Sequence, residues 1–130
     1  MSVAKMINLH PDVAGNLNEE LATAIRHIMY AAPITASCAD ACLAEDGVAD
    51  MRACIRKCLD ASDVCAMATT VATRRAASNE AILRQALELA VAACQTCADE
   101  CAKHDTDHCR QCETMCREVV DDARKAIANL

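Results

Sequence analysis

Apolar residues recur at three- and four-residue spacing along most of the chain, which is the pattern of amphipathic helices packed around a common core. Short polar or glycine-containing segments divide this pattern into four stretches. We predict helices over about residues 17–44, 49–76, 79–103 and 108–129. Pro33 lies inside the first helix and is expected to kink it or divide it in two. Short connections favour antiparallel neighbours, so the expected fold is all-α, an up-down-up-down four-helix bundle.

The ends of the predicted helices carry start signals. Residues 1–15 are expected to form a short irregular or helical N-terminal lead, which leaves residues 16–130 for the bundle. Asn16 is the expected N-cap of the first long helix, and Glu19 stands three residues later as in a capping box. Ser78 is the expected N-cap of the third long helix.

Each predicted helix has one face on which small, apolar and cysteine residues alternate at helical spacing, and this face is expected to turn inward. The four inward seams read Leu21, Ala24, Ile28, Ala31, Thr35, Cys38 and Cys42; Met51, Cys54, Cys58, Ala61, Cys65, Ala68 and Ala72; Leu83, Leu87, Ala90, Cys94, Cys97, Cys101 and His104; and Cys109, Cys112, Cys116, Val119, Ala123, Ala126 and Leu130. All 11 cysteines of the chain fall on these seams.

The cysteines occupy the end of the first and third helices and the start of the second and fourth. In an antiparallel bundle these four segments lie at the same end, so sulfur should line one half of the interior. The other half is an ordinary apolar core of Leu21, Ile25, Ile28, Leu83, Leu87, Val119 and Ile127. Cysteine as a small hydrophobic residue accounts for one or two of these positions but not for 11 in one half. The asymmetry therefore indicates a site.

Composition and charge exclude several classes of function. The chain has no Phe or Trp and a single Tyr, so Ala, Leu, Ile, Val and Cys must fill the core. A net charge of −6 without a basic tract disfavours nucleic-acid binding. No apolar run approaches the roughly 18 residues of a membrane span. No Ser/His/Asp arrangement or glycine-rich phosphate loop is present, so we expect no enzyme.

The first residues lack an apolar stretch followed by a cleavage site, so no signal peptide is expected. The expected compartment is the cytoplasm, where thiols stay reduced. Cysteines in that compartment point to metal or redox chemistry rather than to a disulfide framework.

Buried thiolates repel one another and need cations, and Cu(I) is a soft, monovalent ion that thiolates select. One Cu(I) per thiolate leaves a core with little net charge, whereas a Zn(II) ion with four thiolates leaves two negative charges per site, which no Lys or Arg of the seams offsets. Two sulfurs four residues apart on a helix point the same way and can clamp one Cu(I). Four such pairs occur: Cys38/Cys42, Cys54/Cys58, Cys97/Cys101 and Cys112/Cys116. Multiple Cu(I) ions are therefore the preferred cargo.

Two alternatives stay open. The runs Cys94-x-x-Cys97 and Cys109-x-x-Cys112-x-x-x-Cys116 resemble ferredoxin spacings, so an iron–sulfur electron-transfer or redox protein is the main competitor. Ferredoxin motifs normally lie on loops followed by Pro, which is absent here. A purely structural helical protein is the second alternative.

Three further residues lie at the cysteine-bearing end. His104 ends the third seam, His108 precedes Cys109, and Met51 begins the second seam. These three are candidate ligands of an entrance through which Cu(I) reaches the thiolates; otherwise they are turn residues and core filler. The complete set of candidate metal ligands is Cys38, Cys42, Cys54, Cys58, Cys65, Cys94, Cys97, Cys101, Cys109, Cys112, Cys116, His104, His108 and Met51.

On the segment Cys94-x-x-Cys97-x-x-x-Cys101-Ala-Lys-His104 and the run from His108 to Cys116, the chain resembles the cytosolic branch of the bacterial copper storage proteins. The resemblance covers about residues 17–128. It implies a cysteine-lined four-helix bundle that stores Cu(I), forms homotetramers and uses histidines at its mouth. A chaperone or a small-molecule thiol is the expected copper donor. Val119 stands where many relatives have another cysteine, which implies a lower capacity here.

Overall fold

A computed structural model of the chain describes residues 1–74 and 79–130. The described part is helical: α1 (Val3–Asn8), α2 (Glu19–Leu43), the 3-10 turn η1 (Val48–Met51), α3 (Arg52–Ala72), α4 (Glu80–Cys101) and α5 (Asp107–Ala128). The four long helices form the predicted bundle, and no strand occurs among the described residues. The prediction of an all-α fold is confirmed.

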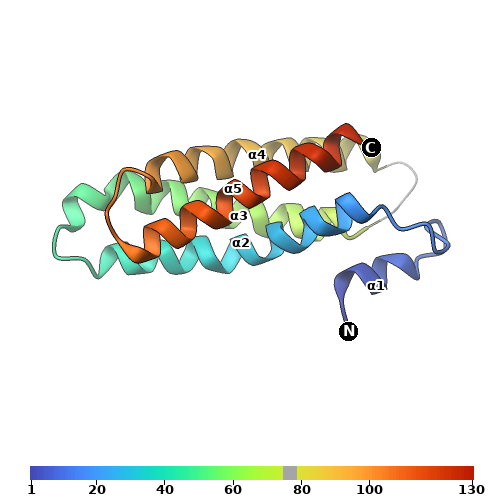
Figure 1. Ribbon diagram of the computed structural model, residues 1–130, viewed down its shortest axis with the longest axis horizontal. Helices are drawn as coiled ribbons and strands as arrows, with labels where there is room; N and C mark the ends of the chain where they lie inside the picture. The colour runs from blue at the N-terminus through green and yellow to red at the C-terminus, as the bar shows by residue number, and fades with distance from the viewer. Residues whose placement is uncertain (75–78) are drawn as a thin grey trace.

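The long helices form a closed ring of neighbours. Contacts join α2 to α3, α3 to α4, α4 to α5 and α5 back to α2. Consecutive helices run antiparallel (Figure 1). The α2–α3 and α4–α5 connections lie together at one end of the bundle, and the C-terminus lies at the opposite end. The short helix α1 packs beside α2, also toward the end that holds the C-terminus. The up-down-up-down order therefore brings the cysteine-bearing halves of all four helices to one end.

Helix α2 begins later than predicted. Its N-cap is Asn18, whose side-chain oxygen accepts from the backbone N–H of Leu21 at 3.0 Å. The predicted cap at Asn16 is wrong because the chain is still turning there: Gly15 adopts a left-handed φ of 83°, and the N–H of Asn16 donates to the carbonyl of Val13. Glu19 is the first helical residue instead of the partner in a capping box.

The connection between α3 and α4 also differs from the prediction. α3 ends at Ala72, four positions before the predicted end at 76, and Asn79 stands at the N-cap position of α4. The predicted cap Ser78 and the last two residues of the predicted second helix lie outside the described residues. The start of the second helix is tighter than expected, because residues 48–51 form a 3-10 turn before α3 begins.

The prediction was that Pro33 kinks α2 or divides it in two, and the division is wrong, because α2 continues without interruption past Pro33. Pro33 removes one backbone donor from this part of the helix. The carbonyl that loses its helical donor is that of Met29, and hydroxyl groups add further bonds to the carbonyls just before Pro33: Thr35 donates to Ala31 at 2.7 Å, and Ser62 of α3 donates to Ala32 at 2.7 Å. The bond from Ser62 also ties α3 to α2 at the position of Pro33.

The predicted seams form the core. Every seam position is buried except His104 and Leu130, which are half-buried. Ile25, Ile28 and Leu87 fill the half of the bundle away from the cysteines, and each is fully buried. Among the described residues, no helix has the length and apolar character that crossing a lipid bilayer requires.

Candidate metal centre

All 11 cysteines are buried and none forms a disulfide. On α3, Cys54 and Cys58 lie one helical turn apart, and Cys65 lies about two turns further along, with Ala61 at the level between. The sulfurs of neighbouring helices meet at these levels. They form three groups in which all sulfur atoms lie within 4.8 Å of one another: Cys38, Cys42, Cys54 and Cys109; Cys38, Cys58, Cys101 and Cys112; and Cys97, Cys112 and Cys116.

The three groups overlap and form one continuous column of sulfur. Cys38 belongs to the first and second groups, and Cys112 belongs to the second and third. At the inner end the sulfurs of Cys65 and Cys94 lie 3.5 Å apart. Because neighbouring groups share a sulfur, a monovalent ion bound in one group lies next to the sulfurs of the following group. Many ions can therefore be held in the column and exchanged along it.

Contacts between helices are as close as contacts within a helix. The Sγ atoms of Cys54 and Cys58, one turn apart on α3, are separated by 3.9 Å. Across helices, Cys54 lies 3.7 Å from Cys101, and Cys58 lies 3.5 Å from Cys97. A soft ion can therefore take two or three thiolates from different helices, and the pairs four residues apart are parts of larger groups.

Burial and mutual contact spread the pKa values of the thiols. Burial raises the pKa of Cys42 to about 12, and burial also raises the pKa of Cys109. In the middle of the column, hydrogen bonding from Cys112 is the main cause that lowers the pKa of Cys101, and the same contact raises the pKa of Cys112. Without a cation the column therefore retains protons on many of its sulfurs, and those protons must leave when a metal binds.

The mouth of the column is its end beside the α2–α3 and α4–α5 connections, where the outermost sulfurs are those of Cys38, Cys42, Cys54 and Cys109. His108 lies at this mouth and contacts two of these sulfurs. Its Nδ1 lies 3.4 Å from the sulfur of Cys38 and 3.6 Å from the sulfur of Cys109. Its Nε2 lies 2.8 Å from Oε1 of Glu45. Burial lowers the pKa of His108, but its contacts with Cys38 and Glu45 outweigh that effect, and the net change of the pKa is upward.

Within the part of the chain that the structure describes, no hydrogen bond joins the other two predicted mouth residues, His104 and Met51, to a cysteine sulfur. His104 follows the end of α4, and its Nε2 is buried with no hydrogen-bond partner among the described residues. A buried imidazole nitrogen without a partner is unfavourable and fits a group that awaits a ligand. Met51 is buried in η1, three residues before Cys54.

A family model described as copper storage protein matches residues 17–128, which is most of the chain. The chain belongs to the copper storage protein family.

Solved structures from the same family are very similar to this chain. The copper storage protein Ccsp from Streptomyces lividans, loaded with 10 copper equivalents, superposes with a TM-score of 0.93 and 32% identity, covering 99% of this chain and 100% of that chain. A cytosolic copper storage protein from Streptomyces lividans with five coppers gives a TM-score of 0.83 and 35% identity over 86% of this chain and 95% of that one. A variant of that protein with two histidines replaced by alanine gives a TM-score of 0.83 and 34% identity, over 86% of this chain and 96% of that one.

Among curated proteins, the cysteine-rich protein YhjQ of Bacillus subtilis (strain 168) is 31% identical over 75 residues. This match covers 58% of the chain and 66% of YhjQ.

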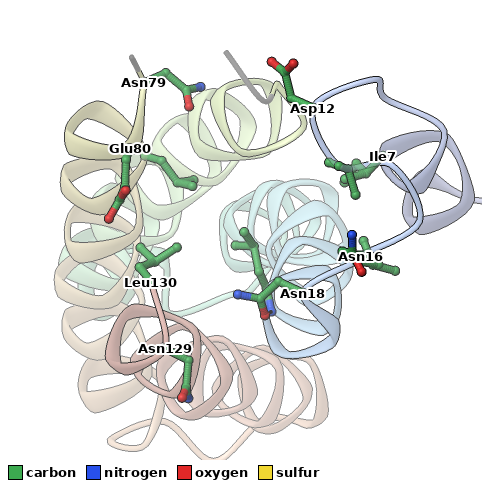
Figure 2. Close-up of a pocket in the computed structure, with 12 residues that line it drawn as sticks. Ile7, Asp12, Asn16, Asn18, Asn79, Glu80, Asn129 and Leu130 are labelled. Atoms are coloured by element: carbon green, nitrogen blue, oxygen red, sulfur yellow. Dashed lines mark hydrogen bonds between the residues drawn. The ribbon is translucent and has the colours of Figure 1, made fainter. Parts of the chain in front are cut away.

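One cavity of the bundle is separate from the sulfur column. It measures about 480 Å³ and lies at the opposite end, where Asn18, Asn79 and Asn129 stand around its rim (Figure 2). Asn18 caps α2, the amide of Asn79 donates to the carbonyl of Arg74, and that of Asn129 donates to the carbonyl of Lys125. The described residues that line this cavity include no Cys, His or Met, so it is a poor site for a soft metal ion.

One residue of the mouth has a partner that the sequence interpretation did not identify. Sequence reasoning did not select Glu45, which is one of several acidic residues in and around the α2–α3 connection. In the structure Glu45 contacts His108, 63 positions away in the chain. Helical periodicity carries no information on such a distant pair, and the only signal was that Glu45 stands near the predicted mouth.

Proposed function

We propose that this protein stores and buffers Cu(I) in the cytosol by binding several ions through its buried cysteine thiolates. The observation that supports this most directly is the overlap of the sulfur groups, because Cys38 and Cys112 join them into one column. Family membership and the copper-loaded Streptomyces structures support the same function. The description of one of these neighbours as cytosolic supports the compartment.

The proposed mechanism is binding with release of protons. Cu(I) arrives from a chaperone or a small-molecule thiol and enters at the end that bears the α2–α3 and α4–α5 connections. His104, His108 and Met51 receive it there, and the 11 cysteines are the storage ligands. Each ion replaces thiol protons, so a filled column carries little net charge inside the bundle. Storage, and not catalysis, is the proposed role of the site.

The proposed assembly is a homotetramer. Large apolar side chains are exposed on α3 and α4, with Leu59 48% and Leu89 49% accessible, and such residues are available for contacts between copies of the chain. Light scattering coupled to size-exclusion chromatography measures the mass directly. A single species of one chain mass would contradict the tetramer without affecting the storage proposal.

An anaerobic Cu(I) titration of the reduced protein, with a coloured Cu(I) chelator as competitor, tests the function. We expect the protein to withhold several equivalents before the chelator develops colour. A Cys94→Ser/Cys97→Ser variant should withhold fewer equivalents, because it lacks two sulfurs of the inner half of the column. Colour from the first equivalent in the wild-type protein would exclude Cu(I) storage. Visible absorption after iron and sulfide reconstitution would then support the iron–sulfur alternative.

A further inference from the structure

We propose that Glu45 is a positioning residue for copper binding: its carboxylate holds the imidazole of His108 so that Nδ1 faces the sulfurs of Cys38 and Cys109. The inference rests on the proposed function, since it concerns how one ligand of the mouth is presented to Cu(I). Glu45 itself does not touch a sulfur, and it acts through His108.

The hydrogen-bonding chemistry of the pair determines the tautomer of His108. An ionised carboxylate can only accept, so the bond of 2.8 Å to Oε1 of Glu45 requires the proton to be on Nε2 of His108. In the neutral ring Nδ1 is then unprotonated and has a free lone pair. That lone pair lies 3.4 Å from the sulfur of Cys38 and 3.6 Å from that of Cys109. Glu45 therefore selects the tautomer that can bind a metal at Nδ1.

The position of Glu45 in the fold restricts the orientation of the His108 imidazole. Its backbone N–H donates to the carbonyl of Cys42 at 3.2 Å, directly after the last turn of α2. Cys42 belongs to the outermost sulfur group, together with Cys38 and Cys109. The carboxylate of Glu45 and the sulfurs of Cys38 and Cys42 are thus held by the last turns of α2 and the residues just after it, and they meet His108 and Cys109 from the first turn of α5. A carboxylate that orients a ligating histidine raises metal affinity in many sites, and its loss typically costs about 10- to 100-fold.

A purely structural ion pair would have a different role, since it would only tie the α2–α3 connection to α5. The tautomer of His108 separates the two roles without any copper. In the reduced apo protein, at a pH where the ring is neutral, long-range proton–nitrogen NMR should show the Nε2-protonated tautomer in the wild type. Glu45→Ala should give a mixture of tautomers. Glu45→Gln retains an acceptor oxygen and should preserve more of the wild-type tautomer than Glu45→Ala.

Copper affinity gives the second readout, and Asp46 offers a matched control. Asp46→Ala removes the same charge one residue away, without contact to His108. In chelator competition we expect Glu45→Ala to weaken the affinity for the Cu(I) ions that bind at the mouth by about 10- to 100-fold. Asp46→Ala should change this affinity by less than about threefold. The total number of equivalents should stay unchanged, because no thiol is lost. In a His108→Ala background, Glu45→Ala should have no further effect.

The inference is overturned if Glu45→Ala leaves the tautomer unchanged, or if it weakens copper binding equally with and without His108. An equal loss in Asp46→Ala would assign the effect to charge alone and would also overturn it. Failure of the proposed function looks different. In that case the wild-type protein would withhold no Cu(I), while the tautomer of the apo protein would still report the role of Glu45.

Discussion

At the scale of single residues, the cysteines are not equivalent, because their sulfurs take part in different numbers of groups. Cys112 contributes to two groups and lies 3.9 Å from both Cys58 and Cys97. Among the described sulfurs, Cys65 has a hydrogen-bonding distance to Cys94 alone. A sulfur shared between groups bridges ions, whereas a sulfur at the end of the column serves fewer of them.

Removal of a shared sulfur should therefore cost more copper than removal of an end sulfur. We expect Cys112→Ala to lose about two Cu(I) equivalents and Cys65→Ala to lose about one, since each Cu(I) takes two or three thiolates. The chelator titration counts the equivalents, and circular dichroism checks that both variants keep the helices. Equal losses in the two variants would show that the sulfurs act as independent sites.

The pKa values of the thiols predict how binding responds to pH. Burial raises the pKa of Cys42 to about 12 and raises that of Cys109, so both thiols hold their protons at neutral pH and release them to Cu(I). Proton release means that affinity increases with pH, by about tenfold per pH unit for each proton displaced. Competition titrations between about pH 6 and 8, corrected for the ionisation of the chelator, measure the slope. Affinity that is independent of pH would contradict binding by protonated thiols.

At the scale of the elements, the start of α5 is the segment on which the mouth depends most. Thr106 is its N-cap and accepts from the backbone N–H of Cys109 at 3.2 Å. Arg110 adds ion pairs to Asp105 at 2.6 Å and to Asp107 at 2.5 Å on the exposed side. These contacts fix the first turn of α5, which presents His108 and Cys109 to the column.

Loss of the cap should destabilise the bundle and loosen the mouth. We expect Thr106→Ala to lower the free energy of unfolding of the reduced apo protein by about 1 kcal/mol, and Thr106→Ser to lower it by much less. Denaturant unfolding followed by circular dichroism measures both values. If Thr106→Ala and Thr106→Ser unfold alike, the hydroxyl bond to Cys109 contributes little.

At the scale of the whole molecule, the bundle combines two different interiors. One half is a conventional core in which Ile25, Ile28 and Leu87 are fully buried. The other half replaces such side chains with small thiols, which bury less apolar area per residue than Leu or Ile. The copper-binding half is therefore expected to be the less stable half of the apo protein, and bound ions should join its four helices.

Copper that binds only the folded bundle should stabilise it in proportion to the logarithm of its free concentration. At about 1,000 times the dissociation constant the gain is about 4 kcal/mol, which corresponds to a rise in Tm of about 15 °C for a chain of this size. Anaerobic thermal unfolding with increasing Cu(I) equivalents measures the rise. An unchanged Tm would mean that the unfolded cysteines bind Cu(I) as well as the folded column does.

The sequence alone determined the fold, the inward seams and the half of the bundle that holds the cysteines. Helical periodicity is a local property, and short connections leave few ways to arrange four long helices, so these predictions are confirmed by the structure. The predicted helix ends agreed less well with the structure than the predicted helices themselves. The cap moved from Asn16 to Asn18 because the chain still turns at Gly15, and α2 continued past Pro33 without being divided.

Only the tertiary structure decided which sulfurs meet and how the mouth is built. The overlap through Cys38 and Cys112 depends on the relative heights of four helices, which periodicity along each helix does not specify. The same holds for Glu45 and His108, which approach only when the α2–α3 connection packs beside the start of α5. Spacing along a helix reveals which way a side chain points, but the distance between side chains on different helices is set by packing.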